Sequence, residues 1–164
     1  NQENDLFEWM TVSDNMKIVS KNNDLIKKYL ELTHLSDFVN YYPRQLSGGM
    51  KKRLSLARAL LVNPKFIIMD ESFASLDHNI KGMLHEEVLK IIKETGKTVL
   101  LVTHDIDEAI FLSDRILFIS GKPIEIKNEI KIPLNHPRII SIKDSDEFDS
   151  LKNNVKKEIT DYNY

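Results

Sequence analysis

The sequence predicts an α/β protein in which strands and helices alternate through the second half of the chain. Residues 66–69 and 98–102 are two short, almost wholly apolar runs. Between them, apolar residues recur at the 3.6-residue period of a helix, at Ile80, Met83, Leu84, Val88 and Ile91. A strand, a helix and a second strand of this kind are typical of a parallel sheet whose strands are covered on both faces.

The first part of the chain is predicted to be mainly helical. We expect Asp24 to cap a helix whose apolar residues are Leu25, Ile26, Tyr29 and Leu30. Ser47 is expected to cap a second helix, from about Gly48 to Val62, which Pro64 prevents from continuing. The apolar face of this second helix consists of Leu54, Ala57, Leu60 and Leu61.

The elements that follow are shorter. Gly96 is placed to end the central helix in a left-handed turn. Asp105 and Glu108 have the spacing of a capping box, which predicts a short helix after the second apolar run. Further strands are predicted at residues 116–119 and 124–126.

The remaining features are expected to lie at the surface. After Pro133 the pattern becomes irregular, until a charged stretch at residues 145–159 predicts a surface helix with Phe148, Leu151 and Val155 on one side. Four histidines show no placement that indicates chemistry and are expected to be surface residues: His34, His78, His85 and His136.

The composition excludes several classes of protein. The chain has 164 residues, of which 41% are hydrophobic, and its 23 basic and 25 acidic residues give a formal charge of -2. This balance does not suggest binding to nucleic acid or to anionic lipid. The absence of cysteine excludes disulfides and thiolate zinc sites. No stretch has the length and hydropathy of a spanning helix or a signal peptide, and because the chain does not begin with Met we expect its true start to lie upstream.

A first candidate site lies at the start of the second helix. Ser47, Gly48 and Gly49 would place a hydroxyl and two unobstructed backbone N–H groups at a helix N-terminus. The partial positive charge of the helix dipole makes such a position attractive to phosphate. The ordinary alternative is a serine cap followed by two flexible glycines.

A second candidate site lies where the two buried strands end. Asp70 and Glu71 follow the first apolar run, and His104 follows the second. Phosphoryl transfer to water needs a metal ion and a group that orients the water, so Asp70 would hold Mg²⁺ and Glu71 would polarise the water. His104 could donate a hydrogen bond to the transferred phosphate. Alternatively, these are acidic and solvated residues of ordinary loops.

One apparent phosphate-binding loop is excluded. Gly96, Lys97 and Thr98 match the end of the motif G-x-x-x-x-G-K-[ST], but Ile91 occupies the position of its first glycine. The five glycines of the chain permit this motif nowhere. The chain therefore lacks the loop that grips the β- and γ-phosphates of a nucleotide.

Together, these motifs resemble the ATP-binding-cassette (ABC) ATPase family. Residues 46–50 are similar to its signature motif, residues 66–71 to Walker B with the catalytic glutamate, residues 75–77 to the D-loop, and His104 to the switch histidine. At the start of the chain, Gln2 and the segment through Trp9, Thr11 and Val12 resemble the Q-loop region of nitrate, sulfonate and taurine importers.

The resemblance implies roles for individual residues. Glu71 and His104 would be catalytic, and Asp70 and Gln2 would hold Mg²⁺. The groups that contact the nucleotide would be Gln2, Ser47, Gly48, Gly49 and Asp77. Two positions depart from the family pattern, because Ser72 replaces a usual proline and Lys52 a usual glutamine. We expect Ser72 to loosen its loop without removing a ligand.

The resemblance also implies a partial RecA-like P-loop NTPase fold. Residues 1–62 would form the Q-loop segment and helical subdomain, residues 63–130 the C-terminal part of the RecA-like core, and residues 131–164 a C-terminal extension. The Walker A strand and the antiparallel β subdomain would be missing. Because that strand lies between the strand before His104 and the strand at 116–119, we expect a gap that a missing segment, a partner chain or a rearranged strand fills, or else marginal stability.

The function implied is that of the ATP-hydrolysing subunit of an importer. It would bind ATP and Mg²⁺ as a head-to-tail homodimer on the cytoplasmic face of the membrane, with permease subunits and, indirectly, a solute-binding protein as partners and no nucleic acid. The solute would be small, similar to nitrate, a sulfonate or taurine. We expect the chain alone to be inactive. The alternatives are an interaction-only ABC fragment and a soluble ABC ATPase without a transport role.

Overall fold

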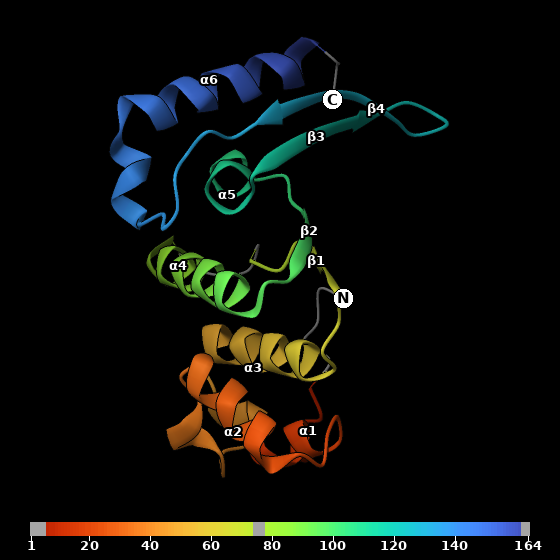
Figure 1. The fold of residues 1–164 in the computed structure, drawn as a ribbon, viewed down its shortest axis with the longest axis vertical. Coiled ribbons are helices and arrows are strands. Elements are labelled where there is room, and N and C mark those ends of the chain that lie inside the picture. Colours follow the sequence, from red (N-terminus) through yellow and green to blue (C-terminus); the bar gives the residue numbers. More distant parts are fainter. Residues whose placement is uncertain (1–5, 74–77, 162–164) are drawn as a thin grey trace. The chain divides into compact units, whose positions relative to one another are not determined.

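A computed structural model describes residues 6–73 and 78–161 (Figure 1). The chain divides into two compact units, residues 1–100 and 101–164. Gln2 and Asp77, for which the sequence predicts roles at a nucleotide site, lie outside the described residues.

The first unit begins with helices that pack on one another. Helix α1 (Val12–Lys17) and helix α2 (Asn23–Leu32) both contact helix α3 (Gly48–Leu61), and the 3-10 turns η1 (Ser36–Phe38) and η2 (Pro43–Gln45) lie between α2 and α3. The predicted apolar face of α3 is confirmed, since Leu54, Ala57, Leu60 and Leu61 are all buried.

The cap of α2 differs from the prediction. The side chain of Asn22, rather than that of Asp24, accepts hydrogen bonds from the backbone N–H groups of Asp24 and Leu25, both at 3.1 Å. Asn22 has the extended backbone of an N-cap residue, with φ of -79°. Asp24 lies inside the first turn, where an acidic side chain interacts favourably with the helix dipole.

A strand, a helix and a strand complete this part of the chain, as predicted. Strands β1 (Phe66–Asp70) and β2 (Thr98–Val102) pair in a two-stranded sheet, and helix α4 (His78–Thr95) connects them. Gly96 has a φ of +62°, so the predicted left-handed turn after the helix is confirmed.

The prediction that both faces of these strands are covered is wrong for the described structure. Ile67 and Met69 are buried, but Ile68 is 65% exposed and Val102 is 46% exposed. Burial alternates along β1 because successive side chains point to opposite faces, and only one of those faces is packed. The β1 run therefore contains more apolar side chains than the described structure buries.

The buried side of α4 also differs from the prediction in two residues. Met83 is 67% exposed, whereas His85, expected at the surface, is 1% exposed. The ring of His85 packs edge to face against Phe73, with 4.7 Å between the ring centroids. His85 follows Leu84 and precedes Val88 by three positions, so the helical period places it on the same buried stripe.

The second unit combines two helices with an antiparallel strand pair. Helix α5 (Ile106–Leu112) precedes strands β3 (Arg115–Ser120) and β4 (Glu125–Lys131). Phe118 pairs with Asn128, and the register shifts between Phe118 and Ile119. After the 3-10 helix η3 (Ile140–Asp144), helix α6 (Asp146–Asp161) packs on α5. As predicted for the charged stretch, Phe148, Leu151 and Val155 are its buried residues.

The described strands form two separate pairs. Among the described strands, β2 pairs with β1 and β3 pairs with β4, and no described strand joins β2 to β3. What fills the position between them in the complete protein stays a prediction.

Candidate functional site

The start of α3 has the geometry of a capped helix N-terminus. The Ser47 hydroxyl accepts a hydrogen bond from the N–H of Met50 at 3.2 Å, so the ordinary capping role is realised. Ser47 and Gly48 are exposed, Gly49 is buried, and the first turn contains no acidic residue. The helix dipole at this position is therefore not compensated by a side chain of the first turn.

The two predicted carboxylates lie at the end of β1. Asp70 is the last residue of the strand and is exposed, while Glu71 is half-buried. Glu71 has a φ of +43°, in the left-handed region that residues with a Cβ rarely adopt. Such backbone strain is concentrated at functional sites, because only a specific requirement maintains it. His34 and Asn63 also have positive φ, but Glu71 is the described residue of this kind that belongs to the candidate carboxylate pair.

The donor groups at this position fit Mg²⁺. Mg²⁺ is usually bound by one or two carboxylates together with water and substrate phosphates, so an exposed carboxylate at a strand end has suitable chemistry. The described residues contain no group of three or more acidic or histidine side chains that could hold a metal ion by themselves. Asp70 would therefore need the nucleotide's own oxygens to complete the coordination.

His104 lies in the second unit, between β2 and α5. Its side chain is exposed, and the next residue, Asp105, is the N-cap of α5. The predicted cap is confirmed, because the Asp105 carboxylate accepts a hydrogen bond from the N–H of Glu108 at 3.1 Å. Glu108 is 2% exposed, and its own carboxyl accepts a hydrogen bond from the Thr103 hydroxyl.

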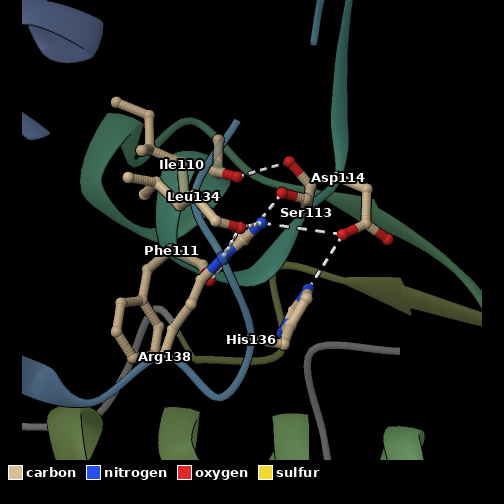
Figure 2. Close-up of polar contacts among 8 residues, drawn as sticks. Ile110, Phe111, Ser113, Asp114, Leu134, His136 and Arg138 are labelled. Atoms are coloured by element: carbon tan, nitrogen blue, oxygen red, sulfur yellow. Dashed lines mark hydrogen bonds and ion pairs between the residues drawn. The ribbon is translucent and has the colours of Figure 1, made fainter. Parts of the chain in front are cut away.

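The structure adds a buried arginine that the sequence interpretation missed. Figure 2 shows Arg138 beside the end of α5, where it donates hydrogen bonds to the carbonyls of Ile110, Phe111 and Ser113 at 2.8 to 3.2 Å. It also donates to the carbonyl of Leu134. Arg138 lies in the stretch where the sequence pattern is irregular, so no periodicity indicated its burial.

A buried asparagine stabilises the segment that follows Gln2. Asn15 is fully buried, its carbonyl oxygen accepts from the N–H of Phe7, and its amide group faces the carbonyls of Phe7, Met10 and Thr11 at 3.0 to 3.1 Å. The Arg58 guanidinium of α3 lies over the Phe7 ring, 5.1 Å from its centroid.

A cavity of about 390 Å³ lies within the first unit, next to the loop after Glu71. Its lining includes Lys52 and Arg58 of α3, Met69 of β1, and Ser72 and Phe73 of the loop. Asp70 and Glu71 are not among the described residues that line it. The cavity therefore borders the candidate site without containing its carboxylates.

Comparison with known proteins gives one consistent result. Residues 1–74 match the family model for ABC transporters. The chain is 40% identical over 159 residues to the aliphatic sulfonates import ATP-binding protein SsuB of Bacillus thuringiensis subsp. konkukian, covering 94% of this chain and 62% of that protein. It is 41% identical over 145 residues to an uncharacterised ABC transporter ATP-binding protein of Methanocaldococcus jannaschii, covering 84% of this chain and 54% of that protein.

Solved structures agree with the sequence comparison. A dimeric ATP-binding cassette in a post-hydrolysis state, bound to ADP and Pi, has a TM-score of 0.64 and 30% identity, covering 82% of this chain and 62% of that one. The cbiO1 protein of Clostridium perfringens, part of the ABC transporter complex cbiONQ, has a TM-score of 0.65 and 27% identity, covering 70% of this chain and 48% of that one.

The match is partial in length. The chain spans about 54% to 62% of the curated relatives described above. No helix within residues 6–73 and 78–161 is long and apolar enough to cross a membrane. The α/β fold agrees with the comparisons, and the chain is similar over most of its length to the ATP-binding domains of the ABC transporter family.

Proposed function

We propose that the complete protein containing these residues is the ATP-hydrolysing subunit of an ABC importer. The observation that carries this proposal is the pair of consecutive carboxylates at the end of β1, with Glu71 in a left-handed backbone conformation. An acidic residue maintained in a strained conformation beside an exposed second carboxylate suits a site that binds a metal–nucleotide complex and orients water.

The predicted site residues have distinct roles in this proposal. Glu71 orients the attacking water and accepts its proton, and His104 donates a hydrogen bond to the phosphate oxygens. The N–H groups at the start of α3 stabilise the negative charge of the γ-phosphate of a nucleotide bound by a second subunit. Bound Mg²⁺, held by Asp70 and Gln2, would withdraw charge from the phosphate oxygens.

The composite site implies a head-to-tail homodimer, in which each subunit contributes the start of α3 to the nucleotide of the other. A solved relative of this chain is a dimer, which supports the proposal. The proposed location is the cytoplasmic face of the membrane, where the dimer docks on permease subunits. A solute-binding protein is proposed as an indirect partner of the complex. The similarity to an aliphatic sulfonate importer supports a small sulfonate as the solute.

We propose further that residues 1–164 alone do not hydrolyse ATP, because they contain no phosphate-binding loop. Their isolated activity would then be limited to interaction. A soluble ABC ATPase without a permease is the second candidate, but no feature of the described residues favours it over the importer.

The test compares the product of the complete coding sequence with the 164-residue chain. We expect the complete product to bind MgATP and hydrolyse it, and the short chain to show neither property in an equilibrium titration and a phosphate-release assay. Glu71→Gln in the complete product should lower kcat by about 100-fold or more while leaving ATP binding intact. Tight MgATP binding by the short chain would contradict the proposal of a missing phosphate-binding loop.

A matched control is available on β4. Glu129 forms an exposed ion pair with Arg115, 3.2 Å between Nε and Oε1, in the second unit. Glu129→Gln makes the same chemical change as Glu71→Gln outside the site and should leave kcat unchanged. If both variants lost activity equally, Glu71 would have no specific role. The solute is tested separately, by sulfonate, nitrate and taurine uptake in cells that lack the gene.

A further inference from the structure

A closed ring of hydrogen bonds links the two sequence neighbours of His104, Thr103 and Asp105, to Glu108. The Thr103 hydroxyl donates to the carboxyl of Glu108, and the same hydroxyl oxygen accepts from the N–H of Asp105 at 3.1 Å. The Asp105 carboxylate accepts from the N–H of Glu108 at 3.1 Å, which closes the ring. The residues on both sides of His104 are therefore bound to the first turn of α5.

The ring is anchored in the core of the second unit. Glu108 is 2% exposed, and Ile110 and Phe111, two and three residues later on the same helix, are fully buried. Breaking the hydrogen bonds of a buried carboxyl costs free energy, because the polar group would be left unsatisfied in the interior. The side chain of His104, in contrast, is exposed. The ring thus fixes the backbone on each side of His104.

We propose that Glu108 is a positioning residue for His104, acting through the hydroxyl of Thr103. This inference rests on the proposed function, since it assumes that His104 contacts the phosphate during hydrolysis. In the proposal, Glu108 touches neither nucleotide nor water. It maintains the turn from which His104 reaches the phosphate, and a misplacement of about 1 Å at such a position can lower a rate about 100-fold.

The sequence alone assigns a different role to Glu108. In a capping box the side chain of the residue at this position returns to the N–H of the cap residue. Here the N–H of Asp105 donates to Thr103, and Thr103 in turn donates to Glu108. The threonine hydroxyl therefore connects the two halves of the box across His104, which gives Thr103 and Glu108 a joint effect on the histidine.

The kinetic test uses paired variants of the complete gene product. Glu108→Ala removes one hydrogen bond of the ring and Thr103→Val removes two. We expect both variants to lower kcat by about 10- to 100-fold, with KM for ATP changed less than about threefold. Glu108→Gln and Thr103→Ser keep a side-chain oxygen at the same place, and both should retain kcat within about threefold. Ile110→Val removes one buried methylene from the same helix and controls for destabilisation, so its kcat should stay unchanged.

A second measurement reports the ring without depending on activity. In hydrogen exchange of the same preparations, the amide of Asp105 should lose protection at least about tenfold in Thr103→Val and keep it in Thr103→Ser. Equal protection in these two variants, or a Glu108→Ala enzyme with the kcat of the wild type, would overturn the proposal and leave the proposed function standing. A wild-type complete product that cannot hydrolyse ATP would overturn the proposed function, and the role of Glu108 with it.

Discussion

The buried guanidinium of Arg138 lies 3.6 Å from the carboxylate of Asp114, a side chain that is 82% exposed. The ion pair therefore has one partner in the interior and one in water. Burial lowers the pKa of Arg138, and the nearby charge of Asp114 opposes that effect. The shorter contacts of Arg138 are with backbone carbonyls at the end of α5. Its main role is to satisfy those carbonyls, which a helix of this kind leaves without partners.

Replacement of Arg138 should destabilise the second unit strongly. Arg138→Met keeps much of the apolar stem and removes the donors, so the carbonyls of Ile110 and Phe111 each lose a buried hydrogen bond. We expect a loss of about 3 kcal/mol or more in the free energy of unfolding, because several buried acceptors are affected at once. Chemical denaturation followed by circular dichroism measures this loss.

Arg115 provides the matched control. It forms an ion pair with Glu129, but both side chains are substantially exposed, at 59% and 36%. Arg115→Met makes the same chemical change and should cost less than about 1 kcal/mol, as exposed ion pairs usually contribute little. Similar losses for the two variants would show that the carbonyl contacts of Arg138 do not contribute to stability.

The difference between Arg138 and the residues that the sequence did predict has a physical reason. Ser47, Gly96 and Asp105 act on the backbone within a few residues of themselves, so local sequence determines their conformation. Arg138 contacts carbonyls more than 20 positions away in the chain. Such a contact depends on the fold as a whole, and no periodic pattern in the sequence predicts it.

The candidate site also combines features that the local sequence predicts with features that it does not. The positions of Asp70 and Glu71 at the end of β1 follow from the apolar run before them, and the strand was predicted correctly. The left-handed backbone of Glu71 and the ring around His104 could not be predicted, because they depend on turn geometry that many sequences of similar composition do not share. His85 was misplaced for a related reason, since a polar residue on a buried stripe contradicts the usual pattern.

Replacement by aspartate should destabilise the protein far more at Asn15 than at an exposed asparagine. Asn15→Asp would replace an amide nitrogen that lies 3.0 to 3.1 Å from three carbonyl oxygens with a carboxylate oxygen that repels them, and we expect a loss of about 2–4 kcal/mol at neutral pH. Trp9 is the sole tryptophan and lies 5.4 Å from the ring of Phe7, so its fluorescence reports this segment.

The control for Asn15 is the same substitution at a helix cap. Asn22 is exposed and accepts two hydrogen bonds at the start of α2, a role that aspartate performs equally well. Asn22→Asp should therefore leave the unfolding transition almost unchanged. If Asn15→Asp were equally harmless, the three carbonyl contacts would not matter for the stability of the segment.

Gly96 should resist replacement for conformational reasons alone. Its φ is +62°, but a Cβ built on it would meet no atom within 4 Å. Gly96→Ala should therefore cost only the penalty of a left-handed backbone, about 1 kcal/mol. Gly96→Asn should cost less, because asparagine adopts this conformation more readily. A thermal unfolding series of the two variants tests the order, and an asparagine variant less stable than the alanine variant would contradict it.

The buried charge of Lys52 should destabilise the folded protein at neutral pH, and this destabilisation should disappear at high pH. Lys52 lines the cavity beside α3, and burial lowers the pKa of its ammonium group below the ordinary 10.5. Since the folded state disfavours the charged form, the penalty is complete below the lowered pKa and fades as pH approaches 10.5, where the unfolded chain also loses the proton. Lys52→Gln, which introduces the residue usual in the family, should therefore stabilise the chain at pH 7, with the gain shrinking toward pH 10.5. Lys27→Gln is the control, because Lys27 is 77% exposed and should show no such gain. Urea denaturation of both variants from pH 7 to pH 10 measures the effect, and a gain that increased with pH would show that burial of the charge is not its cause.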